Sequence, residues 1–454
     1  MSATADSRLG CGIGKPMHSR RGTHAEWRIN PMMRLNAPAV YFTEDVAKDA
    51  RCTERMNRMM RFITTERVEK VDDAALSRIA LASGWHEPRL KGEMRPYQEP
   101  PILFNTFRWH SDEEKKKRLE KFPALALGEF PKGKLAGYIG FDWRGAAKQF
   151  GPGVRVCQPA HEMHTIAGCP FRCDYCSHLG DVIVVMLNME EFIARMDGWL
   201  DKCPDQTLFK WDNATDAPCF EPEYGGTKLF VDYFARKPGK YLLLYLGKCA
   251  DVDYLLDYDH RGKTIVAFSI SAQTQSTRIE KGSAPTGARI EAVRKCQQAG
   301  YIVRVRFSPI IPVRNWRDEN RAMVRSFLSQ VTPDVISLCL FGWMDAYKVK
   351  RSLDVSLWDE RFVKAMDDAA VEMRGKAYGP LPHDARAEMI RFFIDEIRAV
   401  NPRVPIALCL ESFEMWQQFG PELKMRPDRY LCNCGPQCTP GTELYAEMQR
   451  AYGN

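Results

Sequence analysis

Three cysteines on one short segment have the clearest capacity for chemistry. Cys169, Cys173 and Cys176 follow the spacing C-x3-C-x2-C. Three thiolates this close together on a loop can ligate three irons of a [4Fe–4S] cubane. The fourth iron then lacks a protein ligand and can bind a small molecule. The spacing therefore predicts an iron–sulfur cluster with one open coordination position.

A zinc site is the alternative interpretation of the same three cysteines. Structural zinc sites have four ligands, which are commonly two C-x2-C elements or a mixture of cysteine and histidine. His161, His164 and His178 are close enough in sequence to supply a fourth ligand. A non-catalytic zinc or iron–sulfur binding module therefore remains open beside an enzyme centre.

A second group of cysteines, Cys432, Cys434 and Cys438, lies near the C-terminus in a segment with Gly and Pro. This spacing suits an auxiliary iron–sulfur cluster, completed by a distant cysteine such as Cys409 or by substrate. A zinc staple, a redox disulfide and a thiol hydrogen donor are the alternatives. We expect the remaining cysteines to be small apolar side chains or exposed thiols: Cys11, Cys52, Cys157, Cys203, Cys249, Cys296 and Cys339.

Composition is that of a globular protein with reduced thiols. The chain has 454 residues, of which 45% are hydrophobic and 27% charged, enough for two or three domains. No apolar stretch has the length of a membrane helix. The net charge of +7 permits an anionic partner without requiring one. Fifteen cysteines without a secretion signal indicate a cytoplasmic protein.

Strand and helix patterns alternate after the first cysteine group. A helix is predicted over Thr286–Ala299 and ends at Gly300. A second helix is predicted over His383–Val400. Alternation of this kind implies a parallel sheet, either open or closed into a barrel. The predicted strands are Leu208–Asp212, Leu242–Lys248, Thr264–Ala272, Ile302–Ile310, Val335–Phe341 and Val404–Leu410.

Two of these strands carry polar residues at every second position. One has Arg304, Arg306 and Ser308, and the other has Ser269 and Ser271. In a barrel, one strand face is directed into the lumen. We expect these side chains there, where the arginines can meet a carboxylate or phosphate. An edge strand with a wet face is the alternative.

The first cysteine group, with Tyr175 just before its last member, resembles the signature of the radical S-adenosylmethionine (SAM) superfamily. Downstream, the segments 248–256, 268–271, 289–292 and 299–301 resemble the spore photoproduct lyase branch, and 39–43 resembles its opening. The resemblance covers roughly 160–315. It implies an α/β fold, namely a partial (β/α)6-type barrel over 156–345. The expected additions are a flexible tail (1–40), a mixed N-terminal region (41–155) and a helical C-terminal region with the second cysteine group (346–454).

The resemblance also implies a chemistry. A [4Fe–4S] cluster would bind SAM and take an electron from a flavodoxin- or ferredoxin-type reductant. Cleavage of SAM would give a 5′-deoxyadenosyl radical that abstracts a hydrogen from substrate. By resemblance, Lys248, Ser269 and Ser308 would contact SAM, and Asn213, Thr215 and Asp216 would lie near its amino group. The strand pattern adds Ser271, Arg304 and Arg306 to the expected cofactor-binding residues, with capping of strand ends as the alternative for each.

The sequence departs from spore photoproduct lyase, which splits a thymine photoproduct in DNA, at two positions. Asn213 occupies the position of that family's hydrogen-donating cysteine, and an amide is a poor hydrogen-atom donor. Cys219, six residues on, is the candidate substitute, although the strand register argues against it, and Tyr175 is the other candidate catalytic residue. Ser177 replaces a tyrosine that follows the last cluster cysteine. The resulting hypothesis is radical chemistry on an unidentified substrate, with repair of a DNA photoproduct as its alternative.

Overall fold

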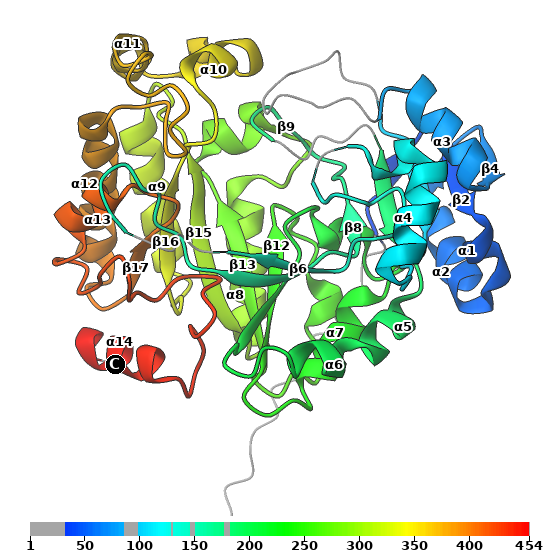
Figure 1. The fold of residues 1–454 in the computed structure, drawn as a ribbon. Coiled ribbons are helices and arrows are strands. Elements are labelled where there is room, and N and C mark those ends of the chain that lie inside the picture. Colours follow the sequence, from blue (N-terminus) through cyan, green and yellow to red (C-terminus); the bar gives the residue numbers. More distant parts are fainter. Residues whose placement is uncertain (1–31, 86–98, 129, 146–149, 177–181, 454) are drawn as a thin grey trace, which may run out of the picture.

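Two β-sheets that meet near the middle of the molecule form its framework (Figure 1). They are seen in a computed structural model that describes residues 32–85, 99–128, 130–145, 150–176 and 182–453. Ser177 and His178 lie outside the described residues, as does most of the predicted N-terminal tail. Within the described part, a short strand pair already forms at β1 (Leu35–Asn36) and β3 (Ile63–Thr64).

The larger sheet has eight strands in the described residues, in the order β17-β16-β15-β13-β12-β11-β7-β6. All neighbours are parallel except β6 and β7. No described pairing closes the sheet, so the predicted partial barrel is confirmed, with seven parallel strands instead of six. The strands are β6 (Phe141–Arg144), β7 (Ala160–Met163), β11 (Leu208–Trp211), β12 (Tyr241–Gly247), β13 (Thr264–Ile270), β15 (Ile302–Ile310), β16 (Ile336–Leu340) and β17 (Ile406–Leu408).

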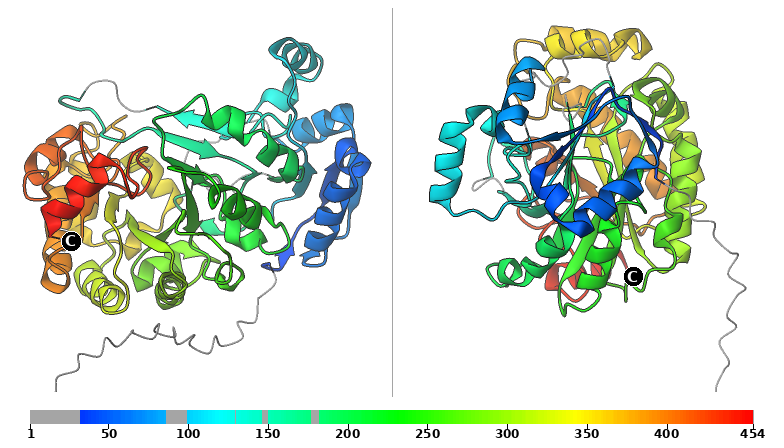
Figure 2. Two further views of the ribbon diagram at one scale, coloured as in Figure 1. Left: turned by 90° about the horizontal axis from the view of Figure 1, so that it is seen from below. Right: turned by 90° about the vertical axis from the view of Figure 1, so that its right-hand side faces the viewer.

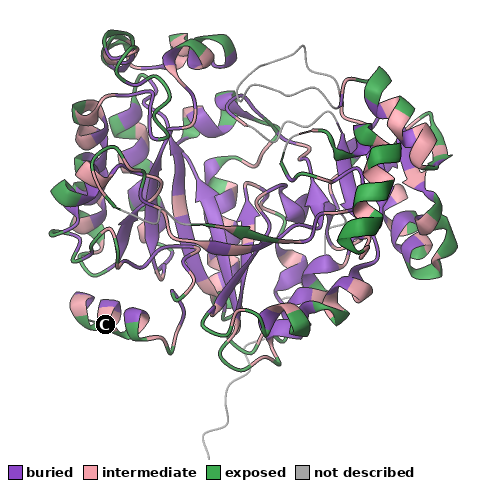
Figure 3. Ribbon diagram, viewed as in Figure 1, coloured by how far each residue is buried: buried purple, intermediate pink, exposed green. Residues whose placement is uncertain are grey.

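Helices cover the outer face of this sheet (Figure 2). Their apolar stripes are buried on the strands while their outer faces are exposed (Figure 3). Phe393 of α12 packs on Phe307 of β15, with 5.7 Å between ring centroids. The covering helices are α5 (Met189–Ala194), α6 (Met196–Leu200), α7 (Gly226–Phe234), α8 (Thr286–Gln298), α9 (Trp316–Leu328) and α12 (His383–Val400). The inner, concave face is the lumen of the partial barrel.

The smaller sheet has the order β4-β2-β5-β10-β8 and joins the predicted N-terminal region to the barrel region. Its strands are β2 (Val40–Thr43), β4 (Val68–Val71), β5 (Ile102–Asn105), β8 (Ile166–Ala167) and β10 (Ile183–Met186). Nearby helices are α1 (Glu44–Lys48), α2 (Ala50–Met60), α3 (Asp73–Ala82) and α4 (Asp112–Lys121). Because β8 and β10 flank the first cysteine group, that group lies where the two sheets meet.

The C-terminal region wraps one side of the large sheet (Figure 1). It contains α10 (Ala346–Ser352), α11 (Glu360–Asp368), α13 (Phe413–Phe419) and α14 (Glu443–Tyr452), besides α12 and β17. The helix predicted over His383–Val400 coincides with α12, and the strand predicted over Ile302–Ile310 coincides with β15. Within the described ranges, no helix combines the length and apolarity that crossing a bilayer requires.

Candidate active site

The first cysteine group is attached to the large sheet by a short strand pair. β9 (Arg172–Cys173) pairs antiparallel with β14 (Glu280–Lys281), which follows β13. Asp174 extends this attachment, because its carboxylate accepts from Lys281 Nζ at 2.8 Å. The three cysteines therefore lie at the carboxyl edge of the parallel strands, where barrel folds place their functional groups.

A buried carboxylate fixes the segment between the cysteines. Glu280 is fully buried and accepts hydrogen bonds from Tyr175 Oη (2.6 Å), Ser271 Oγ (2.7 Å) and Gln275 Nε2 (2.9 Å). Arg289 pairs with it at 2.7 Å. Burial acts to raise the pKa of Glu280, but Arg289 holds it below the usual value. Tyr175 and Ser271 thus anchor the loop through an ionised carboxylate.

Cys173 is buried, and Cys169 and Cys176 are half-buried. Burial, followed by Asp216 and Cys176, raises the pKa of Cys169, and burial raises that of Cys173. Such thiols stay protonated until a metal displaces the proton. Gly168 (φ +96°) makes the turn into the group, where a Cβ would stand 2.9 Å from Val182 O. An all-sulfur donor set on a tight loop fits an iron–sulfur cubane.

Two of the histidines named as possible zinc ligands, His161 and His164, have other partners. His164 Nδ1 is 2.7 Å from Asp212 Oδ1 in a fully buried pair. His161 packs against Trp143, with ring centroids 4.4 Å apart, and Trp199. Across the described ranges, no three His, Cys, Asp or Glu side chains are arranged to hold a single metal ion.

The ends of β11 and β12 are joined beside the cysteines. Asp216 accepts from the backbone N–H groups of Lys248 (2.6 Å) and Cys249 (3.4 Å), and burial raises its pKa to about 6. Gly247 is required here, because a Cβ would lie 2.2 Å from Asp216 Oδ2. Asp216 is therefore held by backbone amides. The neighbouring Thr215 Oγ1 is buried without a hydrogen-bond partner.

Lys248 places a cation at the cysteine group. Its Nζ lies 5.6 Å from the centre of the Tyr175 ring. Burial acts to lower the pKa of Lys248, but Glu280 and Cys173 raise it above the usual value. The ammonium is thus retained next to the thiols. It can meet a carboxylate there.

A chain of polar contacts crosses the lumen below this edge. Ser269 Oγ lies 3.2 Å from Tyr245 Oη, and Tyr245 accepts from Arg306. Arg306 Nη2 in turn contacts the sulfurs of Cys339 and Cys409, each at 3.3 Å. The hydrogen bond from Cys409, together with Arg306, lowers the pKa of Cys339 to about 5 against the effect of burial. The predicted Ser269 and Arg306 do share the lumen.

Sequence reasoning missed Tyr245 and Cys339 in this chain. Strand alternation could have indicated Tyr245, because it is two residues beyond Leu243 on the same face of β12. Predicting the contacts between these residues requires the register of β13 with β15, which pairs Ser269 with Arg306.

Asn213, at the position of the family's hydrogen donor, also belongs to the lumen. With its amide nitrogen directed at Glu162, Asn213 donates to Glu162 Oε2 and accepts from Lys210 Nζ, both at 3.2 Å. Lys210 also pairs with Glu162 at 3.1 Å and lies 4.9 Å from the Tyr245 ring centre. Glu162 and Lys210 face each other in register on β7 and β11.

Three further predicted residues, Arg304, Cys219 and Ser308, have protein groups as neighbours. Arg304 pairs with Asp334 at 2.7 Å and donates to three carbonyls of the C-terminal segment, so its donors hold that segment. Cys219 is fully buried in η2 (Ala217–Phe220), and burial and the neighbouring Cys249 thiol raise its pKa. Ser308 adjoins Cys339 and contributes to its lowered pKa.

The second cysteine group also assembles. The Cys432 backbone N–H donates to Cys438 Sγ at 3.3 Å, and Arg144 Nη2 donates to Cys434 Sγ at 3.3 Å. Cys409, one candidate for completing this group, contacts Arg306, as Cys339 does.

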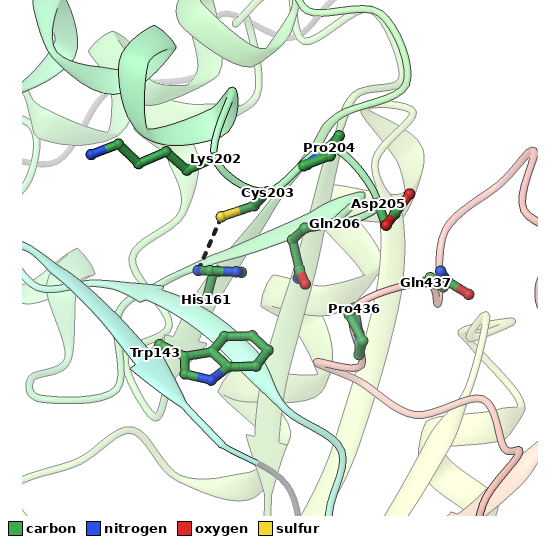
Figure 4. A pocket seen from close by; sticks show the side chains of 9 residues that line it. All are labelled: Trp143, His161, Lys202, Cys203, Pro204, Asp205, Gln206, Pro436 and Gln437. Carbon is green, nitrogen blue, oxygen red and sulfur yellow. Dashed lines mark hydrogen bonds between the residues drawn. The ribbon is translucent and has the colours of Figure 1, made fainter.

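A surface pocket of about 500 Å³ lies on the outer side of this C-terminal segment (Figure 4). His161 and Cys203 face each other in it, with 4.0 Å between Nδ1 and Sγ. Pro436 and Gln437 form part of its wall. None of the first cysteine group lines it, so the pocket is separate from the candidate active site.

Comparison with known proteins identifies the barrel region. Residues 157–355 match the spore photoproduct lyase family. This region of the chain is therefore similar to spore photoproduct lyase. Spore photoproduct lyase of Bacillus subtilis (strain 168) is 29% identical over 175 residues, which cover 37% of this chain and 51% of that protein. The Clostridium acetobutylicum (strain ATCC 824) protein of the same name is 23% identical over 179 residues, 38% of this chain and 53% of that protein.

The chain thus spans about half the length of the curated relatives it matches. The fold likeness extends further. A structure of spore photoproduct lyase complexed with a dinucleoside spore photoproduct has a TM-score of 0.55, with 17% identity, over 82% of this chain and 98% of that one. At this identity the likeness shows a shared fold.

Proposed function

We propose that this protein is a radical SAM enzyme whose Cys169, Cys173 and Cys176 hold a [4Fe–4S] cluster. The observation that carries the proposal is the position of these thiols: Cys173 is buried, Cys169 and Cys176 are half-buried, and their segment is fixed at the carboxyl edge of a partial barrel through Tyr175 and Glu280. When bound, such a cluster supplies one electron to SAM, whose cleavage yields a 5′-deoxyadenosyl radical. A flavodoxin- or ferredoxin-type protein would be the electron donor, and the cytoplasm the compartment.

The chain's own residues would bind and orient SAM. Lys248 offers a cation beside the thiols, suited to the carboxylate of SAM, and Thr215 offers a hydroxyl without another partner. Ser269 and Arg306 border the lumen next to them. The hydrogen bonds from Ser269 through Tyr245 to Arg306 would keep these groups in position and limit the entry of water.

Repair of a DNA photoproduct is the second candidate function. It is favoured by the match of residues 157–355 to the spore photoproduct lyase family. Asn213 stands where that family has its hydrogen donor, so this route needs another thiol. Cys339 and Cys409 are thiols of the lumen face, whereas Cys219 is enclosed beside Cys249.

Anaerobic SAM cleavage tests the first proposal. The protein with dithionite and SAM should form 5′-deoxyadenosine, and Cys173→Ala should abolish this product. Cys296→Ala is the matched control, because Cys296 is equally buried but lies in α8. Product formation by Cys173→Ala at the level of the control, or a colourless protein that contains zinc, would contradict the proposal.

Irradiated DNA tests the second candidate. Incubation with DNA that contains spore photoproduct should return thymine under the same conditions. Absence of thymine in a preparation that still cleaves SAM would remove DNA repair and leave the radical SAM assignment intact.

A further inference from the structure

The C-terminal segment that carries the second cysteine group closes the lumen at the end opposite the active site. Pro436 O accepts from the backbone N–H groups of Thr207 (2.9 Å) and Leu208 (3.2 Å), at the start of β11. Thr439 Oγ1 lies 2.8 Å from Thr207 Oγ1. Because parallel strands share their amino ends, the segment covers the amino edge of the sheet, whereas the first cysteine group lies at its carboxyl edge.

A fourth cysteine, Cys157, is next in sequence to a residue that contacts this segment. Cys157 precedes β7, and the adjacent Gln158 donates to Tyr430 O and accepts from Cys438 Sγ at 3.6 Å. The two segments touch closely at Gly435. A Cβ there would lie 1.8 Å from Gln158 Oε1 and 2.6 Å from Cys438 Sγ, so only glycine fits.

An arginine contacts the second cysteine group. Arg144 Nη2 donates to Cys434 Sγ at 3.3 Å. Cys409 and Cys339 both contact Nη2 of Arg306, each at 3.3 Å.

Buried hydrogen-bond donors without partners surround these four thiols. They are Asn433 Nδ2, Arg144 Nε and Arg306 Nε. Asn433 is only 2% exposed, so water does not satisfy its amide. Buried donors are normally paired, and one amide and two guanidinium donors without partners indicate a site built for an anionic acceptor. A cluster held by four thiolates is such an acceptor, with sulfide and thiolate sulfurs facing outward in all directions.

A single zinc ion is the alternative occupant of this site. A zinc ion with bonds of about 2.3 Å to sulfur holds its thiolates within about 4 Å of one another. Nowhere in the part of the chain that the structure describes are three such side chains arranged to hold one ion. A cubane separates its thiolates more widely, because each sulfur binds a different iron.

We propose that Cys157, Cys432, Cys434 and Cys438 ligate a second [4Fe–4S] cluster at the amino end of the lumen. Arg144, Arg304 and Arg306 would balance its negative charge. All four irons have a protein ligand, so this cluster would hold no SAM. The assignment does not depend on the proposed SAM chemistry, since it concerns a different set of cysteines.

Iron and sulfide analysis of a protein without the first cluster tests the assignment. In Cys169→Ala/Cys173→Ala/Cys176→Ala, purified without oxygen, we expect about four irons and four sulfides per chain. Adding Cys432→Ala and Cys438→Ala should reduce both to below about one. If either multiple variant fails to fold by circular dichroism, reconstituted wild-type protein decides: about eight irons support two clusters, and about four contradict the second.

Two single substitutions in the triple variant assign the fourth ligand. Cys157→Ser should lower the iron content by at least half, whereas Cys409→Ser, the matched control in the same lumen wall, should leave it unchanged. Loss with Cys409→Ser and retention with Cys157→Ser would overturn the ligand set. About one zinc per chain in the triple variant, or no metal, would overturn the cluster itself.

Discussion

The two ends of the lumen differ in how their buried polar groups are satisfied. At the carboxyl end, Glu280 accepts from three side chains and pairs with Arg289, so the protein itself completes the network. At the amino end, Arg144 Nε and Asn433 Nδ2 have no partner. A self-contained network can hold its loop before any cofactor binds, whereas donors in excess need an occupant. The first cysteine group should therefore be preformed, and the second should be stabilised by what it binds.

The largest effect is expected from Arg289→Met, which leaves the buried Glu280 carboxylate without its cation. Breaking a buried ion pair costs 3–5 kcal/mol, and the full burial of both partners places this pair at about 4–5 kcal/mol. Denaturant unfolding measures the loss, and the iron of the first cluster should fall with it. Arg294→Met is the control in the same helix, where a surface pair with Glu291 is worth about 0.5 kcal/mol. Equal effects of the two substitutions would show that the network does not anchor the loop.

Arg304→Met should have the complementary effect at the amino end. It removes the pair with Asp334 and the hydrogen bonds to the carbonyls of Cys432 and Asn433. We expect a loss of about 3–4 kcal/mol, slightly smaller because Tyr445 still donates to Asp334. Iron analysis should show loss of the second cluster with retention of the first. Loss of both clusters together would mean that the two ends are not independent.

The pH dependence of the free energy of unfolding should report on His164, which lies between β7 and the first cysteine group. Burial acts to lower the pKa of His164, but Asp212 and Asp142 raise it to about 9 in the folded protein. Between pH 6.5 and about 9 the folded state then binds more protons than the unfolded state, so stability is complete below pH 6.5 and falls as the pH rises toward 9. The fall should reach about 3 kcal/mol at most.

His164→Gln should flatten this pH profile in denaturant titrations at pH 6 and pH 9. The arginine pairs at both ends of the lumen do not titrate in this range, so they cannot produce the same slope. An unchanged slope in His164→Gln would assign the pH dependence to other groups.

The smallest effect is expected from Tyr175→Phe. The substitution removes one of the hydrogen bonds to Glu280 and keeps Arg289 in place, for a cost of about 1–2 kcal/mol. Iron content should stay at the wild-type level, since Tyr175 is a positioning residue for the loop. Loss of the first cluster in this variant would make the tyrosine, rather than the ion pair, the main anchor.

Local patterns were sufficient to predict much of the fold. β15 and α12 have the predicted ends because their apolar periodicity is contained within each element. The two-sheet junction was not predictable, because β8 and β10 belong by sequence to the barrel region but pair within the smaller sheet. Short strands such as β9 and β14 have two residues each, too few for a periodic signal.

The candidate site was predicted in its residues more than in its contacts. The spacing of the first cysteine group is local, whereas Glu280 and Arg289 meet Tyr175 only through tertiary structure. For the same reason Cys157 was expected to be an ordinary small side chain, although Gln158 brings it to a segment about 280 residues away. Arg304 was expected at the cofactor because strand alternation gives the face of a residue but not the end of the lumen.

Electron paramagnetic resonance of the reduced protein, with and without SAM, tests most directly whether the first cysteine group holds an open cubane. We expect a [4Fe–4S] signal whose g values shift when SAM is added, and loss of this SAM-responsive signal in Cys173→Ala. A reduced cluster that ignores SAM, or no cubane that depends on Cys169, Cys173 and Cys176, would contradict the assignment.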